Sequence, residues 1–361
     1  MPVVRQYALL DTADAQQDRR SDYDVTNTVR VSSPADVRSA VQELFETTYP
    51  RVSFDPVWLA FHDFELFYRG LHPDYHGVDT AYHDIQHTLD VTLAVARLVV
   101  GYDSSVETGD RLGPERARFT LVSALFHDFG YLRHRERDRD AANGAEFTLS
   151  HVSRGGTFLE GYLPKVGLAE FAPVVGRVVQ FTGYEMSLDD IELDDPRDST
   201  IGHLLGTADL LAQLADRCYL EKCRDRLYPE FVLGNVATIS GTAANYWSGM
   251  DLLGKTLSFY QQSAQYRLEH SFNRAYRYAE AVFVHGENPY MAFIQKNLMF
   301  LKTIKEKEDW EKLRRRPPCS LADPFGEARL MALAMRKLRT ISEAQREESA
   351  RLRALNPAFT F

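Results

Sequence analysis

The chain has 361 residues, of which 44% are hydrophobic and 26% are charged. This composition excludes a wholly disordered, collagen-like or coiled-coil protein, and the length provides for a large core. The net charge of −9 excludes general nucleic-acid binding, because proteins that grip the phosphate backbone are usually basic. Three cysteines are too few for a disulfide framework, and the sequence predicts a cytoplasmic protein with no signal peptide and no membrane-spanning segment.

The first two thirds of the chain carry helical patterns. Residues 1–50 are expected to form a polar leader and then a helix that starts at Ser33 and Pro34. Apolar stripes at helical spacing predict three further helices, over 79–100, 114–132 and 199–220. The expected N-caps are Asp79 or Thr80 for the first of these and Ser199 or Thr200 for the third.

The last third is also expected to be helical. A connector rich in Gly, Ser and Thr occupies 234–254, and the helices expected after it cover about 252–283, 289–310 and 325–354. The apolar face at 330–341 should pack on the core or on a second subunit of a homo-oligomer. Few segments alternate as strands do, so the sequence predicts an all-α fold in three parts: 1–50, a core over 51–235, and a C-terminal extension over 236–361.

Eleven histidines are present, and six of them fall between residues 62 and 127. In Y-H-D-I-Q-H, residues 82–87, His83 and His87 are four positions apart and share one face of a helix. Imidazole is a common metal ligand and a near-neutral acid or base. Two solvated histidines on a helix are the alternative interpretation of this motif alone.

Two carboxylates fall inside apolar helical patterns. His127 and Asp128 lie within the run Leu121–Leu132, and Asp209 sits at the edge of the apolar stripe of 199–220. A buried carboxylate without a partner costs several kcal/mol, roughly, so each needs a cation, hydrogen-bond donors or a proton. With the histidines they supply mixed N and O ligands, a set that suits a divalent ion such as zinc, manganese, iron or magnesium.

The order His87, His127-Asp128, Asp209 resembles the HD superfamily of metal-dependent phosphohydrolases, and the preceding Y-H-x-x-x-H resembles its HD/PDEase (cyclic-nucleotide phosphodiesterase-like) branch. The resemblance covers residues 80–220 and implies an HD-domain helical bundle with N- and C-terminal helical extensions. It implies that His87, His127, Asp128 and Asp209 bind one or two divalent ions, with Asp128 bridging them when there are two. It further implies that a metal-activated water attacks phosphorus and that His83 protonates the leaving oxygen.

Three further residues are expected in the substrate pocket. Tyr131 stands where many members of this branch have a histidine, and tyrosine is a poorer proton shuttle near neutral pH. His151 roughly matches a later histidine that lines the pocket in some HD enzymes. Gln262, after Phe259 and Tyr260, has about the offset from Asp209 of the glutamine that holds the purine in cyclic-nucleotide phosphodiesterases.

The leading hypothesis is therefore hydrolysis of a small phosphoester, with a nucleotide or cyclic nucleotide as a plausible substrate. A di-iron oxygenase of the HD type is one alternative, for which His134 and His151 are the available extra ligands. A regulatory or assembly module that retains a structural metal is another, but it would not need the acid His83. A second HD dipeptide, His62-Asp63, is interpreted as structural, and Asp216 as the structural partner of an arginine.

Overall fold

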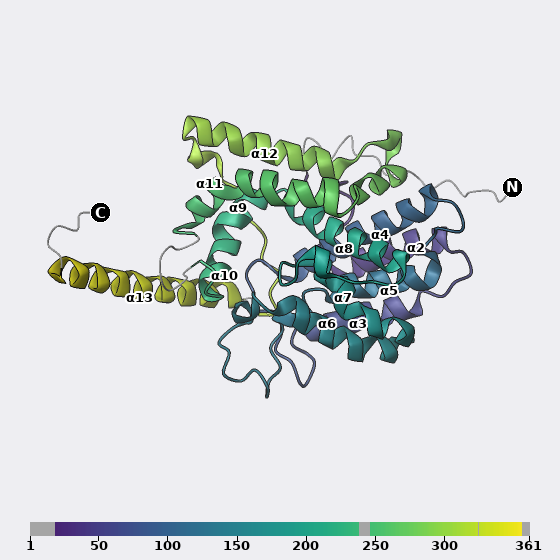
Figure 1. Ribbon diagram of the computed structural model, residues 1–361, viewed down its shortest axis with the longest axis horizontal. Coiled ribbons are helices and arrows are strands. Elements are labelled where there is room, and N and C mark those ends of the chain that lie inside the picture. The colour runs from purple at the N-terminus through teal and green to yellow at the C-terminus, as the bar shows by residue number, and fades with distance from the viewer. Residues whose placement is uncertain (1–18, 238–245, 324, 356–361) are drawn as a thin grey trace.

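The computed structural model describes residues 19–237, 246–323 and 325–355 (Figure 1). The predicted leader lies largely outside the described residues, at 1–18. The described part of the chain is helical and contains no strand, only two isolated bridges. The prediction of an all-α helical bundle is thus confirmed. No helix in that part is both long and apolar enough to cross a bilayer.

Helix α2 (Pro34–Thr48) begins where the sequence predicts. The Ser33 side chain accepts a hydrogen bond from the Asp36 backbone N–H, which is ordinary N-capping. Val37, Val41 and Phe45, spaced by four, form its buried face. Helix α3 (Asp55–Tyr68) follows and packs on α2 and on α5 (Gly113–Phe126).

Helix α4 (Ile85–Ser105) is the centre of the molecule. Every residue from 85 to 103 is buried, because α2, α5, α8 and the segment 275–282 pack around it. The predicted limits, 79–100, are wrong at both ends. Asp84 is the N-cap, and the helix continues through Gly101, whose missing side chain lets the Tyr278 carbonyl approach: a Cβ there would lie 1.8 Å from that oxygen.

The next helices also differ in their limits from the prediction. Helix α5 ends at Phe126, and a short 3₁₀ turn, Phe129–Tyr131, replaces its expected last turn. Helices α6 (His151–Tyr162) and α7 (Ala172–Val178) come next. Helix α8 (Pro196–Ala215) begins before the predicted Ser199 or Thr200, because the Asp195 side chain caps it by accepting from the Arg197 N–H.

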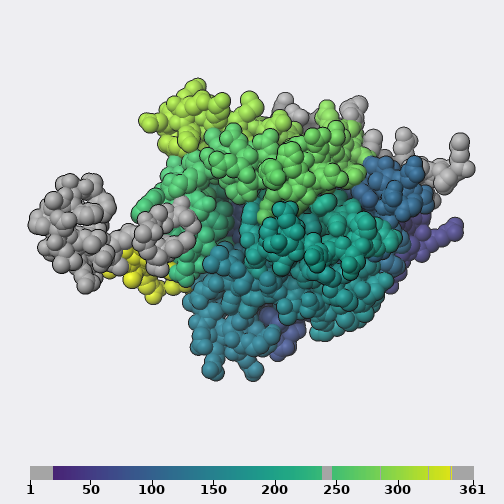
Figure 2. Space-filling model, in the orientation of Figure 1, coloured from purple at the N-terminus to yellow at the C-terminus, as the bar shows by residue number. Residues whose placement is uncertain are grey.

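The elements between α8 and residue 313 form a second layer, the C-terminal layer, which lies above and to the left of the other helices in Figure 1 and is seen in green along the upper edge of Figure 2. It contains α9 (Tyr219–Lys222), α10 (Tyr228–Leu233), α11 (Gly249–Phe259) and α12 (Pro289–Lys307). The continuous helix predicted over 252–283 is wrong. After α11 the chain makes two wide π-helical turns, Tyr260–Ala264 and Arg267–Ser271, and then a 3₁₀ segment, Ala275–Val282. One continuous hydrophobic core nevertheless joins α2, α4 and α12.

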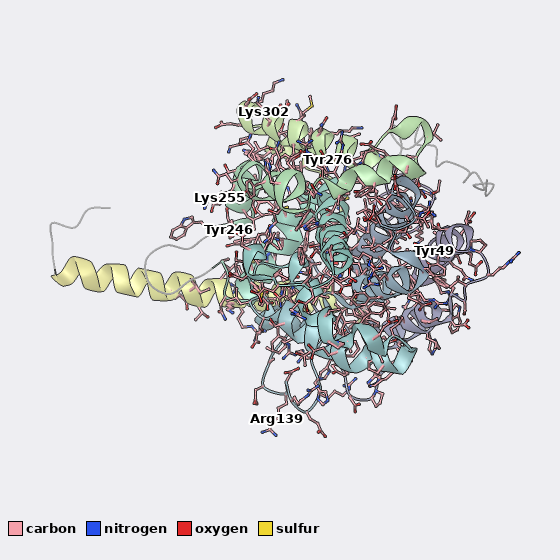
Figure 3. The ribbon with its side chains drawn as sticks, turned by 45° about the vertical axis from the view of Figure 1, so that its right-hand side comes forward. Tyr49, Arg139, Tyr246, Lys255, Tyr276 and Lys302 are labelled. Atoms are coloured by element: carbon pink, nitrogen blue, oxygen red, sulfur yellow. The ribbon has the colours of Figure 1, made fainter. Side chains whose placement is uncertain are left out.

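Residues 313–323, here called the strap, run from the C-terminal layer back to the start of α4. The Ser320 N–H donates to Asp84 Oδ2 at 2.9 Å, and the Ser320 carbonyl accepts from the Ile85 N–H at 3.2 Å. Arg226 donates to the Pro317 carbonyl at 2.9 Å. Helix α13 (Gly326–Leu355) follows the strap and projects away from the body (Figure 3).

Candidate metal centre

The four predicted metal ligands come together from three neighbouring elements. His87 lies in the first turn of α4, His127 and Asp128 directly follow the last residue of α5, and Asp209 lies on α8. His87 Nε2 is 3.3 Å from Asp128 Oδ2 and 3.3 Å from Asp209 Oδ1. His127 Nε2 is 3.2 Å from Asp128 Oδ2. Because α4 packs against both α5 and α8, residues more than 100 positions apart share one centre.

The donor atoms have the chemistry that a divalent cation requires. His127 Nδ1 lies 2.7 Å from the Ala124 carbonyl, which can only accept, so Nδ1 carries the hydrogen and the Nε2 lone pair faces the cluster. His127 Nε2 and Asp128 Oδ2 are buried and have no hydrogen-bond partner of good geometry. Ligand atoms of His87, His127 and Asp209 lie within 4.8 Å of one another. These residues therefore fit a divalent ion bound by nitrogen and oxygen.

Proton affinities in the cluster are strongly shifted. Burial lowers the pKa of His87, but its close contacts with the carboxylates of Asp128 and Asp209 raise it overall, to about 10. Burial raises the pKa of Asp128, yet His127, His83 and His87 together hold it well below the usual range. A cation would compete with protons for the same lone pairs, so metal binding should release protons.

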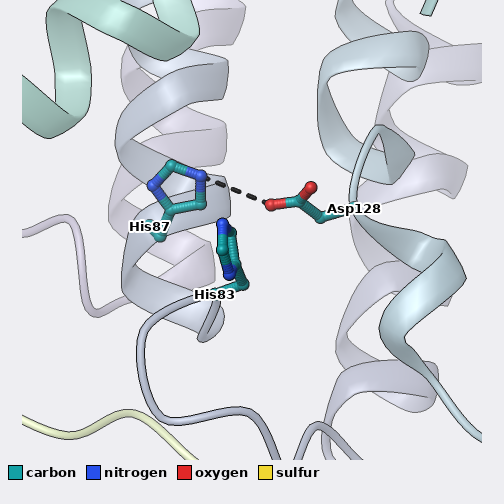
Figure 4. Close-up of side chains that lie close together, drawn as sticks. All are labelled: His83, His87 and Asp128. Atoms are coloured by element: carbon teal, nitrogen blue, oxygen red, sulfur yellow. Dashed lines mark ion pairs between the residues drawn. The ribbon is translucent and has the colours of Figure 1, made fainter. Parts of the chain in front are cut away.

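His83 lies beside these ligands, as Figure 4 shows for His83, His87 and Asp128. Its Nδ1 is paired with Glu230, a fully buried carboxylate on α10. Glu230 also accepts from the backbone N–H groups of Tyr82, at 2.7 Å, and His83, at 3.3 Å. Burial lowers the pKa of His83, but Glu230 and then Asp128 raise it above its usual value.

Sequence analysis missed Glu230. It lies 147 positions from His83 along the chain, and no spacing rule joins the two residues. The available signal was an acidic residue within the apolar pattern of residues 227–233, the same signal that identified Asp128 and Asp209.

Tyr131 and His151 both line the site. The Tyr131 ring stacks with the rings of both His83 and His151, with centroids 4.6 Å and 4.3 Å away, and the two histidine rings lie 6.0 Å from each other. His151 Nδ1 lies 2.8 Å from the Thr148 carbonyl, which leaves Nε2 facing Asp128 Oδ1 at 3.6 Å. The turn at Gly130 permits this stack, because a Cβ there would lie 1.9 Å from the His151 carbonyl oxygen.

A cavity of about 460 Å³ opens onto this cluster. Its walls away from the ligands are mainly aromatic and aliphatic, and they include Phe181, Leu210, Phe231, Leu252 and Phe259. The predicted pocket role of Gln262 is wrong, because this residue is exposed and does not line the cavity. The π-helical turn Tyr260–Ala264 adds a residue to the helical repeat, so an offset counted from Asp209 no longer gives the facing side chain.

The remaining residues discussed above lie outside the centre. His62 stacks on Trp58, and Asp63 accepts from the Tyr162 hydroxyl at 2.8 Å. His134 Nδ1 faces the backbone N–H groups of its own loop. The sequence predicts an arginine as the partner of Asp216, and this is wrong. Asp216 pairs with Lys222 at 2.7 Å.

Comparison of the chain with family models, curated proteins and solved structures finds no match. The functional argument therefore depends on the geometry of the centre.

Proposed function

We propose that this protein is a metal-dependent hydrolase of small phosphoesters, with a nucleotide as the favoured substrate. The observation that carries the proposal is the buried His83–Glu230 pair beside an unsatisfied His and Asp donor set, at one end of a cavity. A purely structural ion needs no oriented imidazole at its side, whereas ester hydrolysis needs a proton donor for the leaving oxygen. The resemblance of the ligand order to the HD/PDEase branch supports the same chemistry.

The side chains divide the work in the proposed reaction. His87, His127, Asp128 and Asp209 would hold the ion, which would activate a water and neutralise the charge on the phosphoryl oxygens. Glu230 holds His83 through Nδ1, so Nε2 is the nitrogen left to give a proton to the leaving oxygen. The ring of Tyr131 keeps the His83 ring in its plane by stacking. The apolar walls keep bulk water from the reacting groups.

Metal content and turnover together test this function. Purified wild type should contain one or two equivalents of metal, and Asp128→Ala should lose it. Wild type loaded with manganese, zinc or iron should hydrolyse bis-p-nitrophenyl phosphate or nucleotide esters. His83→Ala should keep its metal and lose turnover by about 10²- to 10⁴-fold, the usual contribution of a general acid.

Two outcomes would contradict the proposal. Absence of metal from wild type, even after reconstitution, would remove the ligand assignment. Full metal content without hydrolysis of any phosphoester would favour a module with a structural ion.

A di-iron oxygenase is the second candidate, and one observation favours it. His151 Nε2 lies 3.6 Å from the Asp128 oxygen Oδ1, on the side away from His87, where such chemistry requires an additional nitrogen ligand. Oxygen consumption by the ferrous protein would identify it, and phosphoester turnover with zinc or manganese would exclude it as the main activity.

A further inference from the structure

Arg267 enters the same cavity from the C-terminal layer. It begins the π-helical turn Arg267–Ser271 and lines the cavity together with His83, Asp128 and Asp209. Turns of this kind are rare and occur often at functional sites. Its Nη1 donates to the Gly183 carbonyl at 2.8 Å, and its guanidinium lies 3.6 Å from the centroid of the Tyr184 ring.

The charge of Arg267 is not matched by a carboxylate in contact with it. Within the described ranges no Asp or Glu forms an ion pair with this residue. Burial lowers its pKa, and Asp209 is near enough for its negative charge to oppose that change. An arginine nevertheless stays protonated at physiological pH. Only one of its five N–H groups is accounted for by the bond to Gly183.

Lys255, the other cationic side chain of the cavity besides the histidines, provides a contrast. Its ammonium pairs with Asp251 at 2.9 Å and lies 5.4 Å from the ring centroid of Tyr246, beside which it is labelled in Figure 3. Lys255 is therefore paired within its own helix, whereas Arg267 lines the cavity without an ion-pair partner among the described residues.

A partly buried guanidinium in an aromatic and aliphatic wall is a strong site for an anion, because it can bind phosphate or carboxylate through two parallel hydrogen bonds. The scissile phosphoester is expected at the His and Asp cluster, where the ion is the neutralising charge. Arg267 is thus available to a different group. The apolar walls of the cavity, which include Phe181, Leu210 and Phe259, suit an uncharged organic body.

We infer that the substrate carries a second anionic group, a phosphate or carboxylate, beyond the scissile phosphoester, and that Arg267 binds this group. The inference rests on the proposed function of the site and makes Arg267 its specificity-determining residue. The substrate class is a phosphoester with two separated negative charges joined by an apolar or aromatic body.

Matched esters test the inference in the metal-loaded protein. The p-nitrophenyl ester of thymidine 5′-phosphate is compared with the same ester bearing a 3′-phosphate or a 3′-O-succinyl group. Wild type should prefer an anionic ester by about tenfold to a hundredfold in kcat/KM, through KM, as expected for a hydrogen-bonded charge. Arg267→Gln should abolish the preference, Arg267→Lys should retain part of it, and Lys255→Gln should keep it. Whichever of the two anionic esters has the higher kcat/KM in wild type identifies the second anionic group as a phosphate or a carboxylate.

A binding measurement separates this inference from the proposed function. Calorimetry on metal-free protein should show that thymidine 3′,5′-bisphosphate binds more tightly than thymidine 5′-monophosphate, and that Arg267→Gln removes the difference. That result would stand even if no ester were hydrolysed. Equal preference in wild type and Arg267→Gln would overturn the inference. If Arg267→Gln lowered kcat equally for all of the esters, the inference would also be overturned, because Arg267 would then only hold the turn at Gly183.

Discussion

At the scale of single residues, Glu230 sets both the direction and the proton affinity of His83. It accepts from the His83 ring and from two backbone N–H groups, so its position is fixed from three sides. A buried carboxylate next to an imidazole favours the protonated ring. The protonated ring of His83, the form that can act as an acid, therefore persists to higher pH than in an ordinary histidine.

We expect Glu230→Gln to move the alkaline limb of the kcat profile to lower pH. Glu230 raises the pKa of His83, so its loss lets the ring release its proton earlier, and the acid form disappears as pH rises. The shift to lower pH is measured on a phosphoester between pH 5 and 10. Glu185 is another carboxylate of the cavity, but it lies near His151 and not near His83. The control variant Glu185→Gln should therefore leave the alkaline limb of the kcat profile in place. An unmoved limb in Glu230→Gln would mean that another group protonates the leaving oxygen.

The sequence was informative about residues that are costly to bury and silent about their partners. Asp128 and Asp209 stand out because charge interrupts an apolar pattern, and both lie in the cluster. Glu230 carried the same local signal, but its pairing with His83 and the approach of Arg267 to the site arise from tertiary packing, which no local pattern encodes. Gln262 was misplaced because the helix around it is not a regular α-helix.

At the scale of elements, the start of α4 positions the proposed metal ligand His87. Asp84 Oδ1 accepts from the His87 backbone N–H at 3.0 Å, and Asp84 Oδ2 accepts from Ser320 in the strap. The predicted caps, Asp79 and Thr80, are earlier polar residues of the same segment. Sequence could not choose among them, because the choice depends on the strap, which is distant in the chain.

We expect Asp84→Ala to lower the free energy of unfolding by about 1–2 kcal/mol, the usual cost of losing an N-cap. It should also weaken metal binding by about tenfold or more, because the hydrogen bond from the His87 backbone to Asp84 helps to orient His87. Urea unfolding and metal titration measure the two effects. Ser33→Ala, which removes the cap of the remote helix α2, should give a stability loss alone. Equal metal affinity in both variants would show that the cap does not position His87.

At the scale of the whole molecule, one buried charge network joins three distant segments. Arg97 on α4 donates to Asp24 Oδ2 at 2.5 Å and to the Tyr290 hydroxyl on α12 at 2.8 Å. Asp24 and Arg97 are fully buried. The network ties the N-terminal segment and the C-terminal layer to the central helix, and its members lie as many as 266 positions apart.

We expect Asp24→Ala to lower the free energy of unfolding at pH 7 by about 3–5 kcal/mol, since it leaves the Arg97 charge buried and unpaired. Burial raises the pKa of Asp24, but Arg97, Thr26 and a backbone N–H lower it below the usual value overall. The stabilisation is therefore present above about pH 4 and lost as pH falls through the lowered pKa. Urea unfolding at several pH values should show the two proteins converging in acid. Asp22→Ala, in an exposed pair with Arg30, should cost about 1 kcal/mol or less.

The strap has a consequence for how the protein is made. The hydrogen bond from Ser320 to Asp84 joins residues 236 positions apart, and synthesis proceeds from the N-terminus. A nascent chain that already contains His87, His127, Asp128 and Asp209 still lacks the N–H that completes the Asp84 cap. Its ribosome must add more than a hundred further residues before the centre takes its final form. Binding of the proposed ion would thus come late in translation, and a prematurely terminated chain would carry all four proposed ligands without their mature arrangement.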